Sequence, residues 1–556
     1  MRGFLSDLDR TERTLHPSAL SDFRAVLEKV DQHPNERYFI LKSIVLNNLY
    51  GVDIMDEAVE ICKLRLFLKL VAQLANYEQI EPLPDIDFNV RAGNALVGFS
   101  SLEAVRRAMT VTAEGQYRAS SDEDRAAVAR IESDARRAAL AYDAFRTRQT
   151  ALHGRPTATD KEELRARLGR LDGELNRYLA AEYGVSLDNA EALARWRATH
   201  CPFHWFVEFY GIMDSGGFDV VIGNPPYVEY RKVREDYRIR GFLTESCGNL
   251  YAFVMERCKE IMSRQGSISM IVPLSGHSTR RMTPLVNRFY RTFSSLHLST
   301  FSGDANPSRM FDGVKFRLAI FVASGRSGGV FTTRYMRWYA TERDNLFTGL
   351  EYTPLGAPSS HASIPKVSSA VHRNVLAKLA GHRTATPSAL RRSGDRILYH
   401  GAPVNWIKAH TRQPYFHRAR DGHTTSSEIK RFRVSERSRG SVHAILCSST
   451  FFVWWLSWGD CYHLNKAQVE AFPMLRSTRL EYLSGVLEED MTAKTRRRVY
   501  HYKTSGRVEY DEFYMKLSKH IIDDIDRELA RHYGFTDEEL DFVLNYDVKY
   551  RLGQRN

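Results

Sequence analysis

Short apolar runs alternate with amphipathic stretches over the first half of the chain. Four runs have the length and composition of β-strands: residues 48–54 (NLYGVDI), 88–91 (FNVR), 218–223 (FDVVIG) and 266–273 (GSISMIVP). The third run is apolar at most positions, which predicts a strand that is buried on both faces. Helical periodicity follows in residues 251–263 and after Asp56 and Glu57, whose charges suit a helix start. This alternation predicts an α/β fold with a Rossmann-like, doubly wound sheet.

A charged stretch interrupts the alternation between about residues 102 and 196. Apolar residues recur there at spacings of three and four in two separate runs, the pattern of two helices that pack along one another. The first run comprises Val128, Ile131, Ala135, Ala138, Tyr142 and Phe145, and the second comprises Leu164, Leu168, Leu171, Leu175 and Tyr178. Residues 154–159 between them can turn the chain, so we expect an antiparallel helical hairpin.

The pattern becomes irregular from about residue 332. Residues 391–440 hold twelve Lys plus Arg against four Asp plus Glu, so this window carries about +8 of the chain's +12. A dense aromatic run follows, which we expect in a core: Phe451, Phe452, Trp454, Trp455 and Trp458. The end is predicted to be helical, with a helix around residues 520–532 and a capping box of Thr536 and Glu539.

Composition narrows the classes of protein that fit. A chain of 556 residues is expected to form two or three domains, and its net charge of +12 favours a polyanionic partner. The start has no apolar core of a signal peptide and no run approaches eighteen apolar residues, so we expect no membrane partner. The six cysteines form no C-x-x-C pair, which predicts that the protein works in a reducing cytoplasm. The nineteen histidines are scattered without a ligand pattern, so we expect no metal.

Residues 224–227 (NPPY) follow the third strand directly, where open α/β sheets place their sites. Pro225 and Pro226 fix φ and remove two donors, so the turn presents rigid carbonyls between the Asn224 amide and the Tyr227 ring. The Asn224 side-chain oxygen and the Pro225 carbonyl can accept both hydrogens of an exocyclic amine while Tyr227 stacks on the base. Holding both hydrogens would localise the lone pair on the amine nitrogen, so positioning of the amine accounts for most of the catalysis. The alternative is an ordinary strand-to-loop turn.

Two polar residues follow the first two strands. Asp53 ends NLYGVDI, where an acid can accept hydrogen bonds from ribose hydroxyls, although it can equally cap the helix that begins near Asp56. Asn94 lies in the turn after FNVR and can reach an adenine edge. The sequence leaves both interpretations of Asp53 open.

The order of these motifs resembles that of the large N6-adenine DNA methyltransferases found in type IIG restriction-modification enzymes and phage-exclusion systems. The matching stretches are NLYGVDI, FNVRAGNALVG, FDVVIGNPPYVEY, NLYAFVMERC and GSISMIVP. Residues 448–474 resemble those enzymes' target-recognition region, and residues 523–553 resemble their carboxyl-terminal helical tail. The resemblance therefore covers most of the chain.

By this resemblance, the chain transfers a methyl group from S-adenosylmethionine to the N6 amine of a flipped adenine in double-stranded DNA, as part of a restriction-modification or phage-defence system. The resemblance implies that Asp53 binds the cofactor ribose, that Asn94 lies near the cofactor adenine, and that residues 224–227 hold the target. Phe311, in MFDGVKF, matches the aromatic that packs against the target base. Cytosine-N4 enzymes usually begin the turn with Ser or Asp, so Asn224 favours adenine. Release-factor glutamine methyltransferases share NPPY but are much shorter.

One departure concerns the start of the domain. The family begins with a strand and a Gly-rich loop of the D-P-x-C-G-S-G kind that cradles the methionine part of the cofactor, and no such loop precedes NLYGVDI. The first residues, MRGFLSDLDR, resemble the insertion after that loop. We therefore expect an amino-terminally truncated domain without a nuclease. It comes from a split gene or a wrong start, or it is a subunit completed by another polypeptide that supplies the loop. The competing hypothesis is a non-catalytic DNA-binding or specificity subunit of a defence complex. Asn94 also stands where many methyltransferases carry an acid.

The expected organisation has five parts. These are a partial cofactor-binding half of the methyltransferase domain (1–101), a helical hairpin insertion (102–200), the catalytic half (201–330), a mixed α/β target-recognition domain (331–475) and a helical carboxyl-terminal tail (476–556). The hairpin is either purely structural or contacts DNA or a partner. The basic window would clamp DNA through its phosphates.

Overall fold

The chain folds into two compact units. The computed structural model describes residues 27–76, 82–110, 121–150, 157–304, 309–356, 363–382, 390–391, 394–502 and 506–553. One unit comprises Met1–Phe218 and Arg231–Gly241, and the other comprises Asp219–Tyr230 and Phe242–Asn556. Among the helices that the structure describes, none has the length and apolar character that a bilayer crossing requires.

The first unit contains the first two predicted strands. Helix α3 (Glu36–Asn48) leads into β1 (Gly51–Asp53), α4 (Asp56–Val71) follows, and β2 (Val90–Ala92) pairs parallel to β1. Asp56 and Glu57 occupy the first turn of α4, as the charge pattern predicts. Because Asp53 lies opposite Ala92, the loops after both strands leave from the same edge of this small sheet.

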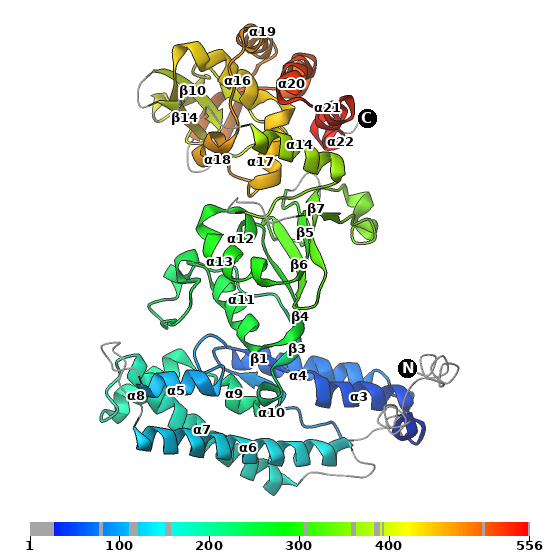
Figure 1. Ribbon diagram of the computed structural model, residues 1–556, viewed down its shortest axis with the longest axis vertical. Helices are drawn as coiled ribbons and strands as arrows, with labels where there is room; N and C mark the ends of the chain where they lie inside the picture. The colour runs from blue at the N-terminus through cyan, green and yellow to red at the C-terminus, as the bar shows by residue number, and fades with distance from the viewer. Residues whose placement is uncertain are drawn as a thin grey trace. The chain divides into compact units, whose positions relative to one another are not determined.

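The predicted helical hairpin consists of α6 (Asp122–Thr150) and α7 (Ala158–Glu182), which lie side by side in Figure 1. Their apolar runs meet in one core, where Ile131, Leu171 and Leu175 are buried. Shorter helices flank the pair: α5 (Leu102–Thr110), α8 (Ala190–His200), α9 (Trp205–Glu208) and α10 (Tyr210–Asp214). Residues 154–156 of the expected turn lie outside the described residues.

The second unit contains a six-stranded sheet in the order β3-β4-β6-β5-β7-β8. The strands are β3 (Phe218–Gly223), β4 (Met262–Pro273), β5 (Ser295–Phe301), β6 (Leu318–Ser324), β7 (Gly329–Met336) and β8 (Thr353–Pro354). β6 runs antiparallel to both β4 and β5, whereas β5 and β7 are parallel. Helices α11 (Leu250–Ile261), α12 (Ser275–Ser278) and α13 (Thr283–Arg288) connect β4 to its neighbours in the chain. The strands are thus distributed over a mixed sheet and the separate pair β1-β2, in an α/β fold.

The prediction that FDVVIG is buried on both faces was wrong. Val220 is 64% exposed and Ile222 is 77% exposed. The physical reason is that β3 is the last strand of its sheet and has a neighbour, β4, on one side only among the strands described. An apolar run of this kind predicts burial only if a second strand and a covering layer are present.

The carboxyl-terminal half adds two four-stranded sheets and a helical core. One sheet has the order β11-β10-β14-β9 and the other β13-β12-β16-β15. Their strands are β9 (Leu390–Arg391), β10 (Asp395–His400), β11 (Ala409–His410), β12 (Phe416–Arg418), β13 (Gly422–His423), β14 (Ile429–Val434), β15 (Arg496–Tyr502) and β16 (Gly506–Glu512). The hairpin of β15 and β16 interrupts the tail that was expected to be helical.

The helices of this half are α14 (Ala370–Gly381), α16 (Arg439–Cys447), α17 (Ser449–Trp458), α18 (Lys466–Ala471), α19 (Thr478–Ala493), α20 (Lys519–Tyr533), α21 (Asp537–Asn545) and α22 (Val548–Leu552). The predicted aromatic core is confirmed, since Phe451, Phe452, Trp454 and Trp455 of α17 are each at most 2% exposed. The predicted capping box of Thr536 and Glu539 opens α21.

Candidate active site

The NPPY turn leaves β3 at its carboxyl end, as the sequence predicts. Asn224 is exposed, Pro225 is buried and Tyr227 is half-buried. The Tyr227 hydroxyl lies 2.7 Å from Asn224 Oδ1 and 3.0 Å from the backbone oxygen of Ile271 in β4. Because one hydroxyl has a single proton, it is shared between these two acceptors. The contact ties the Asn224 side chain to the neighbouring strand.

This arrangement orients the Asn224 amide. The oxygen that accepts from Tyr227 keeps a second lone pair for another donor. Burial raises the pKa of Tyr227 to about 12, so its hydroxyl remains a protonated donor at neutral pH. The Pro225 carbonyl accepts no hydrogen bond from any residue that the structure describes. The turn therefore offers two acceptor oxygens, one of them oriented by a tyrosine.

An aromatic wall stands beside Tyr227. The ring of Phe316 lies 5.7 Å from the Tyr227 ring in an edge-on arrangement, and Phe316 is 52% exposed. Phe311 is 46% exposed, and its part in base packing stays a prediction. Phe316 was not among the predicted site residues, although it lies in the same MFDGVKF stretch as Phe311. Of the two aromatics in MFDGVKF, Phe316 is the one that contacts the NPPY turn.

Asp53 and Asn94 follow the two parallel strands of the first unit. Asp53 Oδ1 accepts a hydrogen bond of 2.9 Å from the backbone N–H of Met55, the residue before α4. Asp53 thus holds the turn into the helix, which was one of the two expected interpretations. Its side chain is exposed, and Oδ2 accepts no hydrogen bond from the described residues. One carboxylate oxygen is therefore left for a ligand.

Asn94 is 3% exposed and tightly positioned. Its backbone N–H donates to Cys201 at 2.7 Å, and its Oδ1 accepts from Leu96. Its Nδ2 is buried without a partner in the described part of the chain. A buried amide donor left unpaired is costly, so a ligand acceptor at this position would stabilise the site.

The residues around Cys201 were not anticipated as part of this site. The backbone of Phe203 passes so close to Gly98 that a Cβ at Gly98 would lie 1.9 Å from the Phe203 carbonyl oxygen. Gly98 also has a φ of +144°, which disfavours other residues. This close approach brings residues 201–203 against the segment that carries Asn94. The spacing of GNALVG suggests a turn but does not indicate which distant segment meets it.

The two groups of predicted site residues belong to different units. Asp53 and Asn94 lie in the first unit, whereas residues 224–227 and Phe311 lie in the second. The structure brings Asp53 and Asn94 to one edge of the sheet formed by β1 and β2, and it brings Tyr227 to Asn224.

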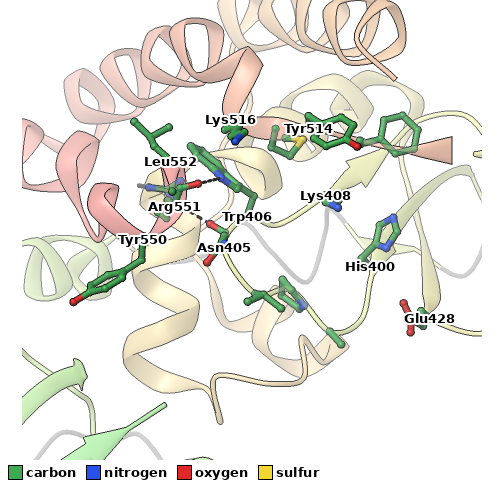
Figure 2. Close-up of a pocket in the computed structure, with 16 residues that line it drawn as sticks. His400, Asn405, Trp406, Lys408, Glu428, Tyr514, Lys516, Tyr550, Arg551 and Leu552 are labelled. Atoms are coloured by element: carbon green, nitrogen blue, oxygen red, sulfur yellow. Dashed lines mark hydrogen bonds between the residues drawn. The ribbon is translucent and has the colours of Figure 1, made fainter. Parts of the chain in front are cut away.

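A large hollow of about 410 Å³ lies elsewhere in the second unit (Figure 2). None of the predicted site residues lines it. The Trp406 indole N–H donates to the Arg551 carbonyl at 3.1 Å, and the Arg551 guanidinium lies 3.8 Å from the Trp406 ring centre. This side of the hollow is thus formed by contacts that hold α22 in place. It contains none of the residues predicted to bind the cofactor or the target base.

Residues 47–293 match the family described as Eco57I restriction-modification methylase, so this part of the chain is similar to that family. The matched residues include Asp53, Asn94 and the NPPY turn and end before Phe311.

One relative has a related description. The chain is 29% identical over 323 residues to RM.MjaORFECS2P of Methanocaldococcus jannaschii, whose name describes a type II restriction enzyme and methyltransferase. That alignment covers 50% of this chain and 27% of the relative, so the chain spans about a quarter of that protein's length.

Solved structures with some similarity include DNA complexes of restriction-modification enzymes. The type IIL enzyme MmeI with DNA has a TM-score of 0.37 at 9% identity, covering 95% of this chain and 78% of that one. The DrdV-DNA complex has a TM-score of 0.24 at 16% identity, covering 38% of this chain and 24% of that one.

Proposed function

We propose that this chain is the catalytic part of an adenine-specific DNA methyltransferase. It would transfer a methyl group from S-adenosylmethionine to the N6 amine of a flipped adenine in double-stranded DNA, in a restriction-modification or phage-defence system. The observation that carries the proposal is the NPPY turn after β3, with Asn224 Oδ1 oriented by Tyr227, within the residues that match the restriction-modification methylase family.

The turn would activate the amine by positioning. Asn224 Oδ1 and the Pro225 carbonyl would each accept one of the two N6 hydrogens. The nitrogen lone pair, otherwise delocalised into the ring, would then point at the methyl donor. Tyr227 and Phe316 would enclose the flipped base, because aromatic rings stack on any base. No strong general base is required, since the proton is lost from a nitrogen that has become cationic.

The first unit supplies groups that fit the nucleoside part of S-adenosylmethionine. Asp53 Oδ2 is available to accept from ribose hydroxyls, and the unpartnered Asn94 Nδ2 can donate to an adenine nitrogen. The cofactor, when bound, supplies an electrophilic methyl group on a sulfonium. Since Asp53 already holds the turn before α4, its carboxylate would be pre-oriented for the ribose.

A second polypeptide segment would complete the methionine side of the site. In support of this, the apolar edge strand β3 exposes Val220 and Ile222, and α4 exposes Ile61, Leu64 and Leu68, each at least 56%. Exposed apolar edges are prone to pair with another strand. A strand followed by a Gly-rich loop would suit β3 and would provide the backbone donors for the cofactor.

A non-catalytic DNA-binding subunit is the second candidate, favoured by the basic window of residues 391–440. Titration calorimetry with S-adenosylmethionine separates the two candidates. The methyltransferase proposal predicts weak binding by this chain and tighter binding when a polypeptide bearing the strand and loop is added. Salt-sensitive DNA binding without any cofactor binding, even with that polypeptide present, would favour the second candidate.

A further inference from the structure

The sheet β11-β10-β14-β9 has one apolar face and one arginine-rich face. Ile397, Tyr399 and Phe432 are each at most 5% exposed and point into the core, where α16 contacts β10 (Figure 1). Side chains alternate along a strand, so the residues between them lie on the opposite face. Arg396 and Arg431 on that face are exposed, which gives it a strong positive charge.

The register of this sheet places like charges together. In the pairing of β10 with β14, Arg396 lies directly opposite Arg433. Two residues further along β10, Leu398 lies opposite Arg431. Like charges facing one another across strands are destabilising. Arg433 donates to the Gly394 carbonyl at 2.9 Å, whereas neither Arg396 nor Arg431 forms an ion pair with any acid among the described residues. The arrangement costs stability in the free protein, and an anionic ligand would relieve it.

These two arginines line a hollow of about 590 Å³. Its lining also contains the polar side chains of Thr411, Gln413, Thr425 and Ser426. The described lining residues include no carboxylate. Guanidinium, hydroxyl and amide groups together form a donor-rich surface that suits phosphate oxygens.

The far side of the hollow is held in place. The Thr411 backbone N–H donates to the Glu488 carboxylate at 3.1 Å, and the Thr411 carbonyl accepts from Arg439 at 3.0 Å. Glu488 in turn lies 3.2 Å from His443. The Thr411 backbone on this side of the hollow is therefore held in place by Glu488 and Arg439.

The hairpin of β15 and β16 offers a contrast. It is also rich in arginine, but three of its four strand arginines have an acid: Arg497 pairs with Asp511 at 2.9 Å and Arg498 with Glu512 at 2.7 Å. Arg507 pairs with Glu509 at 2.8 Å. The fourth, Arg496, lies over the Tyr514 ring at 5.6 Å. Both surfaces are therefore rich in arginine, but most arginines of the hairpin are paired with an acid, whereas Arg396 and Arg431 are not, among the residues that the structure describes.

We propose that the hollow beside Arg396 and Arg431 binds the phosphodiester backbone of duplex DNA, with each guanidinium on phosphate oxygens. The planar fork of arginine matches two such oxygens. The inference rests on the proposed function for the identity of the polyanion and adds the residues that hold it. It also assigns them to the backbone, which carries no sequence information.

The test is the salt dependence of DNA binding by the full chain. Fluorescence anisotropy with a labelled duplex would be recorded at several salt concentrations for wild type, Arg396→Ala, Arg431→Ala and the double variant. Each phosphate contact contributes about 0.9 to the slope of log K against log salt. We expect the slope to fall by about 0.9 for each variant and by about twice that for the double variant. Arg497→Ala, an exposed but ion-paired arginine, is the matched control and should change the slope much less.

Two results would overturn the inference. One is a double variant whose slope equals that of wild type or changes no more than the Arg497→Ala control. The other is an unchanged slope with altered preference among duplex sequences, which would mean that the arginines contact bases. A fall in slope without any methyl transfer would leave the inference standing while the proposed function fails. Circular dichroism of each variant confirms that it is folded.

Discussion

The smallest feature with consequences is the hydroxyl of Tyr227. The family resemblance predicts an aromatic ring at this position, which any aromatic residue would supply. The structure adds a hydrogen bond of 2.7 Å to Asn224 Oδ1. Sequence could indicate the turn, because two prolines after an apolar strand are a local signal. It could not indicate this bond, which depends on how Tyr227 packs against β4.

Tyr227→Phe isolates the hydroxyl from the ring. A single hydrogen bond is worth about 1 kcal/mol, so we expect the methyl-transfer rate to fall about five-fold while the KM for DNA stays the same. Steady-state kinetics with duplex DNA, in the presence of a polypeptide that completes the site, measures both. Tyr482→Phe, at a tyrosine that is 61% exposed, is the control and should retain the wild-type rate. A Tyr227→Phe enzyme with an unchanged rate would remove the orienting role.

Helix α7 shows where periodicity is informative at the scale of an element. Leu164, Leu168, Leu171 and Leu175 were predicted to share one face, and all are buried. Strand β3 shows the opposite, because its composition indicates burial while its place at the sheet edge leaves it exposed. The apolar face of α7 is buried by α6, which lies close to it in the sequence. Burial of β3 would require neighbouring strands, and the local pattern of apolar residues does not reveal where those strands lie.

Leu171→Ala tests the hairpin core. Truncating a buried leucine typically costs about 2–5 kcal/mol, and Leu171 is 4% exposed. We expect hydrogen exchange to show a marked loss of protection in α7. Leu140→Ala, on α6 at 66% exposure, should change stability by less than about 0.5 kcal/mol. Equal effects of the two substitutions would contradict the packing of α6 on α7.

His372 joins α14 to α17 and makes stability depend on pH. Its Nε2 lies 2.8 Å from Ser457 Oγ, and burial lowers the pKa of His372 to about 3. The unfolded chain binds this proton below a pKa of about 6.5, whereas the folded chain does not until about pH 3. Stability is therefore lost as the pH falls through this window, by at most about 1.4 kcal/mol per pH unit from this group.

His372→Gln removes the titration. Thermal unfolding between pH 6.5 and pH 4 should show that the stability of the variant falls less steeply with pH, because glutamine does not bind a proton. The two slopes should differ by at most about 1.4 kcal/mol per pH unit, which corresponds to one proton. An identical pH slope in variant and wild type would show that His372 is not buried as a neutral ring.

At the scale of the whole molecule, the proposed site residues are divided between two units. Those proposed to bind the cofactor nucleoside, Asp53 and Asn94, lie in the first, and those proposed to hold the target base, residues 224–227, lie in the second. Sequence order predicts this division, because the motifs follow one another along the chain. The sequence does not predict which arginines of the basic window remain unpaired, since that depends on the register of β10 and β14.

The central claim is that Asn224 holds the target amine of an adenine in DNA. It is tested most directly by digesting duplex DNA to nucleosides after reaction with labelled S-adenosylmethionine and the completed site. We predict label in N6-methyladenine with wild type, and a loss of about 100-fold or more with Asn224→Ala, as for removal of one essential polar contact. DNA affinity should be nearly unchanged. Label in cytosine or in protein, or equal label from the Asn224→Ala variant, would contradict the account.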